Sequence, residues 1–248
     1  MLPILDLGPL SLPIPPLVLL LGFWLASTLA EKQASKSGAD PEIISKITWV
    51  AVAAGLLGAR LSFIARNMYA FRGQWASVLS LNPALLDISG GLVIAAAASF
   101  YVASKNQRGD WSLLDQFVPF IALFMPAIYI ANFASGAGYG TMTDLPWRIE
   151  IWGAQRHPVQ LYYLLSSLVV FTILEIRKDT DPNPPGSRML SFIIYTAGYI
   201  TIFSRFQDPG GNLVGSFRTL QLTAWAVFTI AMLIAYQQQH REDKNASS

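Results

Sequence analysis

One short segment of the sequence gathers side chains that could carry chemistry. Residues 156–162 read Arg-His-Pro-Val-Gln-Leu-Tyr and stand directly before a long apolar stretch. Pro158 suits the first turn of a helix, so His157 should lie near a helix start, where the positive end favours anions. A histidine in that position could act as a general base. The alternative is that these side chains only anchor the chain at a membrane boundary.

Arg60 is an ionisable residue inside an apolar stretch, where charge is costly and therefore usually functional. It follows Gly55, Gly58 and Ala59, small residues that would let a neighbouring helix approach closely. We expect Arg60 to anchor an anion, and the abundant anion at that depth is a lipid phosphate. The alternative is that its long side chain only reaches out to the outer interface.

Asn132 opens a glycine-rich segment that contains Gly136, Gly138 and Gly140. Such a segment predicts irregular backbone near the membrane surface, which is tolerated where it lines a cavity or is buried in protein. The spacing fits neither a phosphate-binding P-loop nor a dinucleotide fingerprint. A flexible loop between two helices is the alternative interpretation.

The composition indicates that lipid is the solvent of this chain. Only 13% of the residues are charged, about half the share in a typical soluble domain, whereas 53% are hydrophobic and the mean hydropathy is +0.42. This excludes intrinsic disorder, and a net charge of +2 argues against nucleic-acid binding. With no cysteine and only two histidines, His157 and His240, we expect no metal site and no disulfide.

Seven apolar stretches predict seven transmembrane helices, because lipid forces the backbone to satisfy its own hydrogen bonds. They cover residues 10–30, 47–64, 85–103, 113–133, 159–174, 189–203 and 220–236. The predicted fold is therefore all-α and polytopic, with a single transmembrane domain over 1–236 and a polar cytoplasmic tail over 237–248. Asp87 and Asp115, near predicted helix starts, are interpreted as helix caps.

The basic residues between the helices predict the orientation in the membrane. Ten Lys and Arg fall in the segments 31–46, 104–112, 175–188 and 237–248, and six fall in the other connections and the N-terminal segment. This places the N-terminus outside and the C-terminus in the cytoplasm. The loops 65–84, 134–158 and 204–219 would then share the outer face.

Taken in order along the chain, these motifs resemble the bacterial prolipoprotein diacylglyceryl transferase family. The resemblance covers about residues 6–236, and its most specific element is the segment 156–162. The matching elements are Leu7-Gly8-Pro9, Gly22-Phe23, Gly58-Ala59-Arg60, Gly90-Gly91-Leu92, Asp115 with Pro119, Asn132-Phe133 with Gly136 and Gly140, His157 to Tyr162, and Gln221.

The resemblance implies a multi-pass enzyme of the bacterial plasma membrane. It would transfer diacylglyceryl from phosphatidylglycerol to the lipobox cysteine of a prolipoprotein, whose signal peptide is the protein partner, with no cofactor. His157, as the base, and Asn132, as a hydrogen-bond positioner, would be the catalytic residues. The residues expected to contact the lipid phosphate are Arg60, Gln160, Tyr162 and Arg205.

The chain departs from the family pattern at several positions, and three of them bear most on activity. Tyr129 stands where the family has an arginine, Ser89 where it has a histidine, and Ala137 where it has a glutamate. These losses favour an alternative, a divergent non-catalytic member that binds lipid or lipoprotein precursor without turnover. The intact segment 156–162 favours the enzyme.

The missing arginine could be replaced by another basic residue, either Arg205 or Arg218. Arg205 is adjacent to the positions where the family carries charge near the end of the sixth span. We expect Arg205 to reach the same cavity as Arg60, Asn132 and His157.

Overall fold

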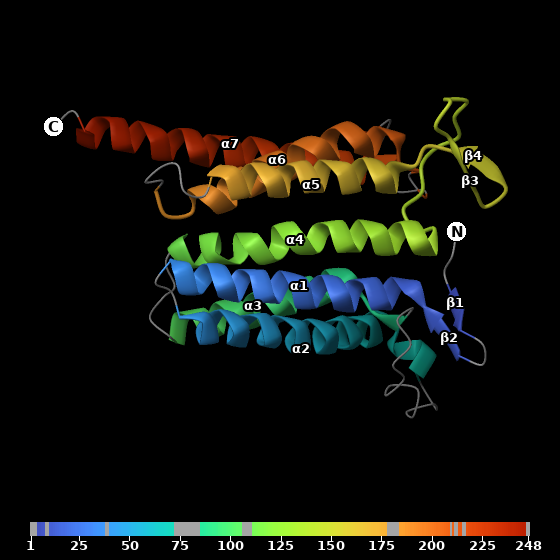
Figure 1. Ribbon diagram of the computed structural model, residues 1–248, viewed down its shortest axis with the longest axis horizontal. Coiled ribbons are helices and arrows are strands. Elements are labelled where there is room, and N and C mark those ends of the chain that lie inside the picture. The colour runs from blue at the N-terminus through green and yellow to red at the C-terminus, as the bar shows by residue number, and fades with distance from the viewer. Residues whose placement is uncertain are drawn as a thin grey trace. The chain divides into compact units, whose positions relative to one another are not determined.

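The computed structural model describes most of the chain and contains seven α-helices within the described residues (Figure 1). The described residues are 4–7, 10–37, 40–71, 85–105, 111–177, 184–208, 210, 213–214 and 217–246. The helices are α1 (Ile14–Lys36), α2 (Pro41–Arg66), α3 (Ile88–Lys105), α4 (Trp111–Ser135), α5 (Val159–Arg177), α6 (Ser187–Phe203) and α7 (Thr219–Ala246). Gly8 and Pro9, the loop residues 72–84 and the side chain of Ser89 lie outside the described part.

Short elements connect the helices. Two 3-10 turns, η1 (Met68–Phe71) and η4 (Ser204–Phe206), follow α2 and α6. Three antiparallel two-stranded hairpins complete the described chain. Their strands are β1 (Ile4–Leu7) with β2 (Leu10–Pro13), β3 (Ile149–Ile151) with β4 (Ala154–Arg156), and β5 (Leu213–Val214) with β6 (Phe217–Arg218).

The predicted all-α, polytopic architecture is confirmed, since each predicted span coincides with one helix. Among the described residues, α1, α2, α4, α5 and α7 are long and apolar enough to cross a membrane, and α3 and α6 are shorter apolar helices. The helix ends differ from the prediction. Residues 10–13 form strand β2 instead of the first helical turn, and α7 continues through the predicted tail to Ala246.

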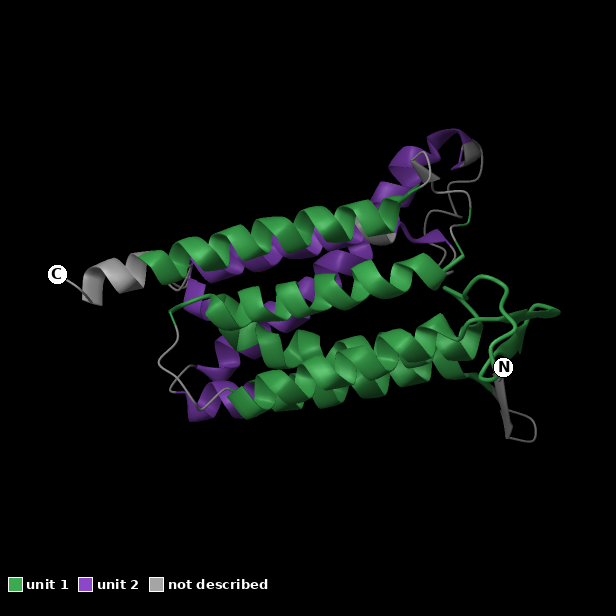
Figure 2. Cartoon of the chain, turned by 90° about the horizontal axis from the view of Figure 1, so that it is seen from above, with its two compact units in different colours: residues 1–30, 114–248 green, residues 31–113 purple. Residues whose placement is uncertain are grey.

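The chain divides into two compact units, one of residues 1–30 and 114–248 (unit 1) and one of residues 31–113 (unit 2), coloured green and purple in Figure 2. Unit 1 has its core between α4, α5 and α6. The buried core residues are Val118, Ala122, Tyr129, Val159, Tyr163, Val170, Leu174, Phe192 and Tyr199. On the other side of α4, Gly22 of α1 lies against Ala127, where an added Cβ would collide.

Asp115 caps a helix other than the one on which it stands. It was expected at the start of the fourth helix, but its two carboxylate oxygens accept from Gly186 N at 2.7 Å and Met189 N at 2.8 Å, at the start of α6. The residue at the α6 cap position is Gly186, which has no side chain that could do this. A carboxylate from α4 therefore satisfies the unpaired N–H groups of α6.

Asp87 caps its own helix, as predicted. Its Oδ1 accepts from Gly90 N at 3.4 Å in the first turn of α3. Its Oδ2 contacts Ser62 Oγ at 2.7 Å and Arg66 Nε at 3.1 Å, both on α2. This one carboxylate therefore joins the start of α3 to the end of α2 within unit 2.

The small residues of α2 allow α3 to approach closely, as the sequence predicted. A Cβ added to Gly91 would lie 2.8 Å from Gly55 O and 2.8 Å from Ala59 Cβ, and one added to Gly58 would lie 2.6 Å from Ile94 Cβ. The two backbones therefore pack with no room for a side chain at Gly91.

Replacing Gly91 by valine is expected to destabilise unit 2. Overpacking a close contact costs about 1–3 kcal/mol, and the backbone oxygen of Gly55 cannot move aside as a side chain can. Thermal unfolding in detergent measures the effect, with Ala96→Val at an exposed position of the same helix as the control. Equal midpoints for the two variants would contradict this packing.

The predicted orientation can be tested on the β3–β4 hairpin. The chain has no native cysteine, so a single Glu150→Cys substitution at an exposed position gives one labelling site. We expect an impermeant maleimide to label it in spheroplasts, whereas a cysteine at the exposed His240 should react only after permeabilisation. The opposite pattern would reverse the orientation.

Candidate active site

The segment between α4 and α5 folds into a hairpin with a tight turn. Strands β3 and β4 pair with Ile151 opposite Ala154, so two residues form the turn. Trp152 and Gly153 have φ values of 53° and 70°, the left-handed conformation that matches the twist of a two-residue hairpin. The Trp152 indole N–H donates to Gly136 O at 3.3 Å, which ties the turn back to the end of α4.

Backbone hydrogen bonds hold this segment against the end of α6. Thr141 N donates to Phe206 O at 2.7 Å, and His157 N donates to Thr141 O at 3.0 Å. Gly140 packs so tightly on His157 that a Cβ there would collide with its carbonyl oxygen. The irregular glycine-rich backbone predicted after Asn132 is therefore buried at Gly136 and Gly140 and exposed at Ala137 and Gly138, and the contact of Gly140 fixes the position of His157.

His157 is 8% exposed and lies immediately before α5, which begins at Val159 as predicted. Its Nδ1 is 3.3 Å from the Tyr162 hydroxyl, which also accepts from the Trp147 indole N–H at 2.7 Å. The Phe206 ring lies 4.9 Å from the imidazole. Burial lowers the pKa of His157 below its ordinary value, so the imidazole is neutral at pH 7 and can take up a proton.

Gln160 joins the start of α5 to the end of α4. It is 1% exposed, and its Nε2 donates to Ala137 O at 2.9 Å, while Ala137 N donates to Asn132 O at 3.0 Å. Its Oε1 is buried without a hydrogen-bond partner. An unpaired buried acceptor is costly, so this oxygen calls for a donor that the described residues do not supply.

A salt bridge that the sequence did not indicate lies beside this segment. The Arg156 guanidinium is 3.2 Å from Asp208 Oδ2, donates to Gly140 O at 3.1 Å, and lies 4.5 Å above the Tyr139 ring. Asp208 N also donates to Tyr139 O at 3.0 Å. Because Arg156 and Asp208 are 52 residues apart, no local pattern could pair them.

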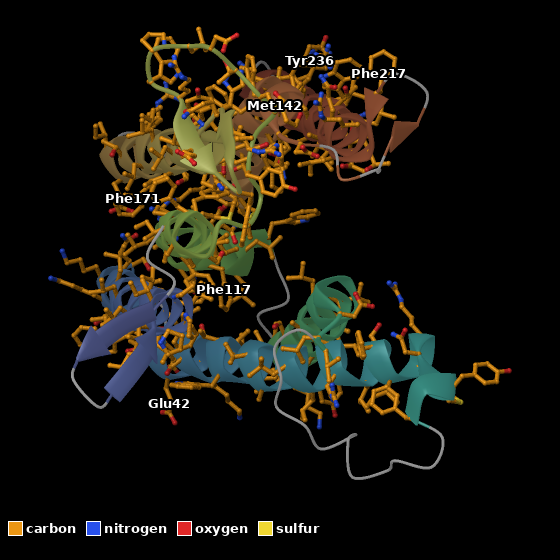
Figure 3. The ribbon with its side chains drawn as sticks, turned by 90° about the vertical axis from the view of Figure 1, so that its right-hand side faces the viewer. Glu42, Phe117, Met142, Phe171, Phe217 and Tyr236 are labelled. Atoms are coloured by element: carbon orange, nitrogen blue, oxygen red, sulfur yellow. The ribbon has the colours of Figure 1, made fainter. Side chains whose placement is uncertain are left out.

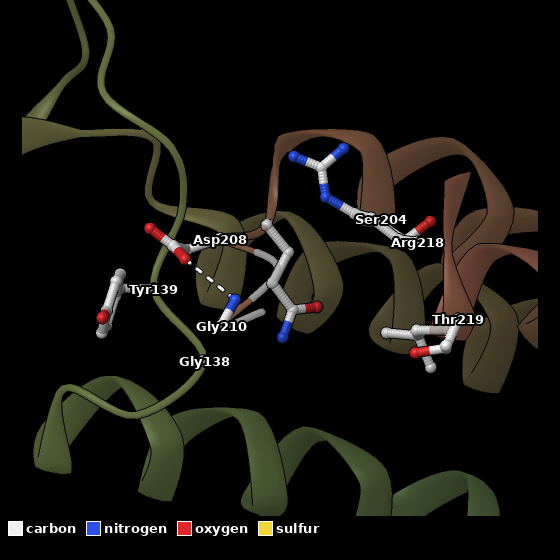
Figure 4. Close-up of a pocket in the computed structure, with 9 residues that line it drawn as sticks. Gly138, Tyr139, Ser204, Asp208, Gly210, Arg218 and Thr219 are labelled. Carbon is white, nitrogen blue, oxygen red and sulfur yellow. Dashed lines mark hydrogen bonds between the residues drawn. The ribbon is translucent and has the colours of Figure 1, made fainter. Parts of the chain in front are cut away.

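A pocket of about 390 Å³ opens next to this salt bridge, between the segment after α4 and the start of α7 (Figure 4). The residues that line it are Gly138, Tyr139, Ser204, Gln207, Asp208, Gly210, Arg218, Thr219 and Leu220. Arg218 is 9% exposed. Arg205, which the sequence favoured as the replacement for the missing arginine, is exposed on η4 and does not line this pocket.

The comparison with known proteins gives the family. Residues 3–237 match the family described as prolipoprotein diacylglyceryl transferase. The chain belongs to this family. The resemblance seen in the motifs is thereby confirmed, and the chain is a multi-pass membrane protein of the prolipoprotein diacylglyceryl transferase family.

Several relatives cover almost the whole chain. The phosphatidylglycerol–prolipoprotein diacylglyceryl transferase of Vibrio vulnificus is 30% identical over 265 residues, which is 96% of this chain and 93% of the relative. The proteins of the same name from Mannheimia succiniciproducens and Vibrio atlanticus are each 29% identical, over 93% and 97% of this chain and 88% and 93% of their own lengths.

Tyr129, at the position where the motif resemblance led us to expect an arginine, is part of an aromatic cluster. The Tyr129 hydroxyl is 3.0 Å from the Tyr199 hydroxyl, and the Tyr129 ring stacks on Tyr163 at 5.2 Å. All three tyrosines are buried. Tyr129 therefore places a neutral hydroxyl here, and Tyr199 satisfies its hydrogen bond. Ala137, in place of the family's glutamate, contributes its backbone oxygen to Gln160.

Arg60 belongs to unit 2, on the half-buried side of α2. Its NH1 donates to Leu85 O at 3.0 Å, and its guanidinium lies 5.6 Å from the centre of the Phe71 ring. The side chain is therefore held in place by the connection between α2 and α3.

Within the described ranges, no three His, Asp or Glu side chains are grouped so that they could hold a metal ion.

Proposed function

We propose that this chain transfers the diacylglyceryl group of phosphatidylglycerol to the lipobox cysteine of a prolipoprotein, in the bacterial plasma membrane. The observation that carries the proposal is the family match over residues 3–237. It is supported by the buried His157 and Gln160, which are packed against the loop after Asn132. The substrates are phosphatidylglycerol and the signal-peptide region of the prolipoprotein.

The reaction is a displacement at the carbon of the diacylated glycerol that is bonded to a phosphate oxygen. The cysteine sulfur forms a bond to this carbon, and the bond from the carbon to the phosphate oxygen breaks. Glycerol 1-phosphate leaves with the bonding electron pair, and the thiol proton passes to a base. The product is a thioether, and no oxidant or reductant is consumed. The thiolate is the reactive form of the nucleophile.

In this proposal His157 is the base. If His157 Nδ1–H donates to the Tyr162 oxygen, the lone pair of Nε2 is left to take the thiol proton. The Tyr162 oxygen then accepts from both His157 and Trp147, and its own hydrogen remains for a phosphate oxygen. Tyr162 would thus connect the base to the leaving group.

The other proposed residues position the substrates. The unpaired Oε1 of Gln160 can accept a hydrogen bond from substrate, and Asn132 supports the same loop. Arg60 and Arg205 are proposed as cations for the lipid phosphate. A fixed cation stabilises the charge that develops on the leaving group, and burial from water strengthens that effect.

The decisive experiment is the reaction itself. Purified protein is incubated in a non-ionic detergent with phosphatidylglycerol and a lipobox peptide, and the peptide mass is measured. We expect a mass increase of one diacylglyceryl group on the cysteine peptide and none on a peptide with serine in its place. Glycerol 1-phosphate should appear in equal amount.

A non-catalytic family member is the second candidate. The specific observation in its favour is Tyr129, which fills the family's arginine position with a neutral, hydrogen-bonded side chain. It predicts that the protein binds phosphatidylglycerol and lipobox peptide but yields no thioether. That result would refute the transferase proposal.

A further inference from the structure

The pocket of unit 1 contains a buried positive charge to which the sequence assigned no definite role. Arg218 lies in strand β6 and is more than nine-tenths buried, and its Nε has no hydrogen-bond partner. No carboxylate among the described residues forms an ion pair with it. A buried guanidinium without an anionic partner is unfavourable unless a ligand supplies the anion.

The pocket also lies at the positive end of a long helix. Thr219 and Leu220, the first two residues of α7, line it together with Arg218. The start of a helix carries a partial positive charge that favours an anion, and phosphates commonly bind there. The helix start and the buried arginine therefore both favour the binding of an anion in this pocket.

The acidic side chain of the pocket does not cancel this charge. Asp208 lines the pocket, but its Oδ2 pairs with Arg156 at 3.2 Å and its Oδ1 accepts from Gly210 N at 3.0 Å. Figure 4 shows Asp208 beside Tyr139, with Arg218 and Thr219 on the side of α7. Among the charged groups that line the pocket, Arg218 alone has no described partner of opposite charge.

The neutral lining suits a polyol. Ser204, Thr219 and Tyr139 supply hydroxyl groups, and Gln207 supplies an amide. The Tyr163 hydroxyl donates to Gln207 Oε1 at 3.2 Å, which leaves the NH₂ end of that amide toward Gly138, at the pocket wall. The Ser204 hydroxyl donates to Thr201 O at 3.2 Å, so it can accept from a glycerol hydroxyl. The NH₂ group of Gln207 and the Tyr139 hydroxyl can donate to phosphate oxygens.

We propose that this pocket binds a phosphoglycerol group and that Arg218 is the residue that holds its phosphate. The identification of the group as part of phosphatidylglycerol, or of the glycerol 1-phosphate that leaves, rests on the proposed function. The anion site itself rests on the buried charge, the helix start and the polar lining. Arg218 is thus, beside Arg205, a second candidate for the cation that replaces the arginine missing from this chain.

The test measures lipid binding in a non-ionic detergent by native mass spectrometry. Phosphatidylglycerol should bind to the wild-type protein much more tightly than diacylglycerol, which lacks the phosphate. Arg218→Gln should weaken phosphatidylglycerol binding by at least about 30-fold, the low end for truncating a buried charge partner, and leave diacylglycerol binding unchanged. Arg148→Gln, at an exposed position of the same unit, is the matched control and should bind as the wild type does.

Two further measurements keep the proposal testable if Arg218→Gln does not fold, which its thermal unfolding will show. Arg218→Lys keeps the charge but loses the planar fork, so intermediate affinity is expected. Glycerol 1-phosphate is added to the wild-type protein. If the site binds both the lipid and the soluble product, glycerol 1-phosphate should displace phosphatidylglycerol. If the site binds only the product, glycerol 1-phosphate should bind and phosphatidylglycerol should not. Unchanged affinity in Arg218→Lys, with no binding of glycerol 1-phosphate, would overturn the proposal.

The parallel thioether assay separates this inference from the proposed function. A wild-type protein that binds phosphatidylglycerol through Arg218 but forms no thioether would refute the transferase proposal and support the anion site. A folded Arg218→Gln protein with wild-type binding and wild-type turnover would refute the anion site and leave the transferase standing. Loss of binding in Arg205→Gln, with binding kept in Arg218→Gln, would assign the role to Arg205 instead.

Discussion

Replacing His157 by glutamine is expected to lower the rate of thioether formation by roughly 100- to 10,000-fold, the range that a general base contributes. Glutamine can still form a hydrogen bond to the Tyr162 hydroxyl, which lies 3.3 Å from His157 Nδ1, but it cannot take up a proton. Initial rates with saturating lipobox peptide measure the loss. Phosphatidylglycerol binding should stay within a few-fold of the wild type, because the phosphate contacts remain.

The pH dependence of the wild-type rate of thioether formation is an independent test of the role of His157. Burial lowers the pKa of His157, so the neutral, proton-accepting form persists below the ordinary value of about 6.5. The rate should therefore be retained on acidification from pH 7 and should fall only at a lower pH, as the imidazole becomes protonated. The contribution of His157 to folding stability should decline from about pH 6.5 downward and level off once the folded imidazole is protonated, because within this range the unfolded chain binds the proton more readily.

The other histidine provides the control. His240 is exposed near the end of α7, where its ring stacks on Tyr236. His240→Gln should keep the full rate and the same acidic decline. A normal rate in a folded His157→Gln protein would exclude His157 as the base.

The helices could be predicted from the sequence because a helix satisfies its own backbone hydrogen bonds in lipid, and an apolar composition alone marks such a segment. Their ends could not. Residues 10–13 are apolar enough for a span but pair with residues 4–7 as a hairpin, and the helix begins at Ile14, where Pro15 and Pro16 fit the first turn. Polarity marked 237–248 as a tail, whereas α7 extends to Ala246.

Asp115 illustrates the limit of local reasoning about caps. A carboxylate near a predicted helix start is normally assigned to that helix. Here the N–H groups that it accepts from belong to Gly186 and Met189, more than 70 residues away along the chain. The missing side chain at the α6 cap position is the only local signal that another residue must fill this role.

The candidate site was predictable where its contacts are local. The segment 156–162 carries His157 just before one helix and Gln160 and Tyr162 in its first turns, and the contact between His157 and Tyr162 joins residues only five apart. The exposure of a large apolar side chain beside this segment was not predictable. Met142, which Figure 3 labels, is 72% exposed although it is apolar, and it stands on a segment that pairs with Arg156.

The pocket depends on contacts between distant segments, and this explains why Arg218 was not preferred over Arg205. Both arginines follow α6 in the sequence, and both have polar residues or glycine nearby, so the local sequence does not distinguish them. Only the turn of η4 decides that Ser204 faces the pocket while Arg205 is exposed. The short strand β6 then brings Arg218 to the start of α7, beside Ser204.

Arg60→Ala is expected to lower thioether formation by about 100- to 1,000-fold, the usual cost of removing a fixed electrostatic donor. If Arg60 anchors a lipid phosphate, the affinity for phosphatidylglycerol should fall together with the rate. Arg66→Gln is the matched control, because Arg66 lies at the end of the same helix and its side chain is mostly exposed. We expect that variant to keep the wild-type affinity and rate.

Arg60→Lys separates an anion anchor from a structural role. The described hydrogen bond of Arg60 runs from one nitrogen to one oxygen, NH1 to Leu85 O at 3.0 Å, and an ammonium can form such a bond. A residue that only held the connection between α2 and α3 would therefore be restored by lysine in both stability and rate. A phosphate gripped at two oxygens needs the planar fork, so lysine should restore the unfolding temperature but only part of the rate. Full recovery of the rate, or unchanged lipid affinity in Arg60→Ala, would limit Arg60 to anchoring its own helix at the interface.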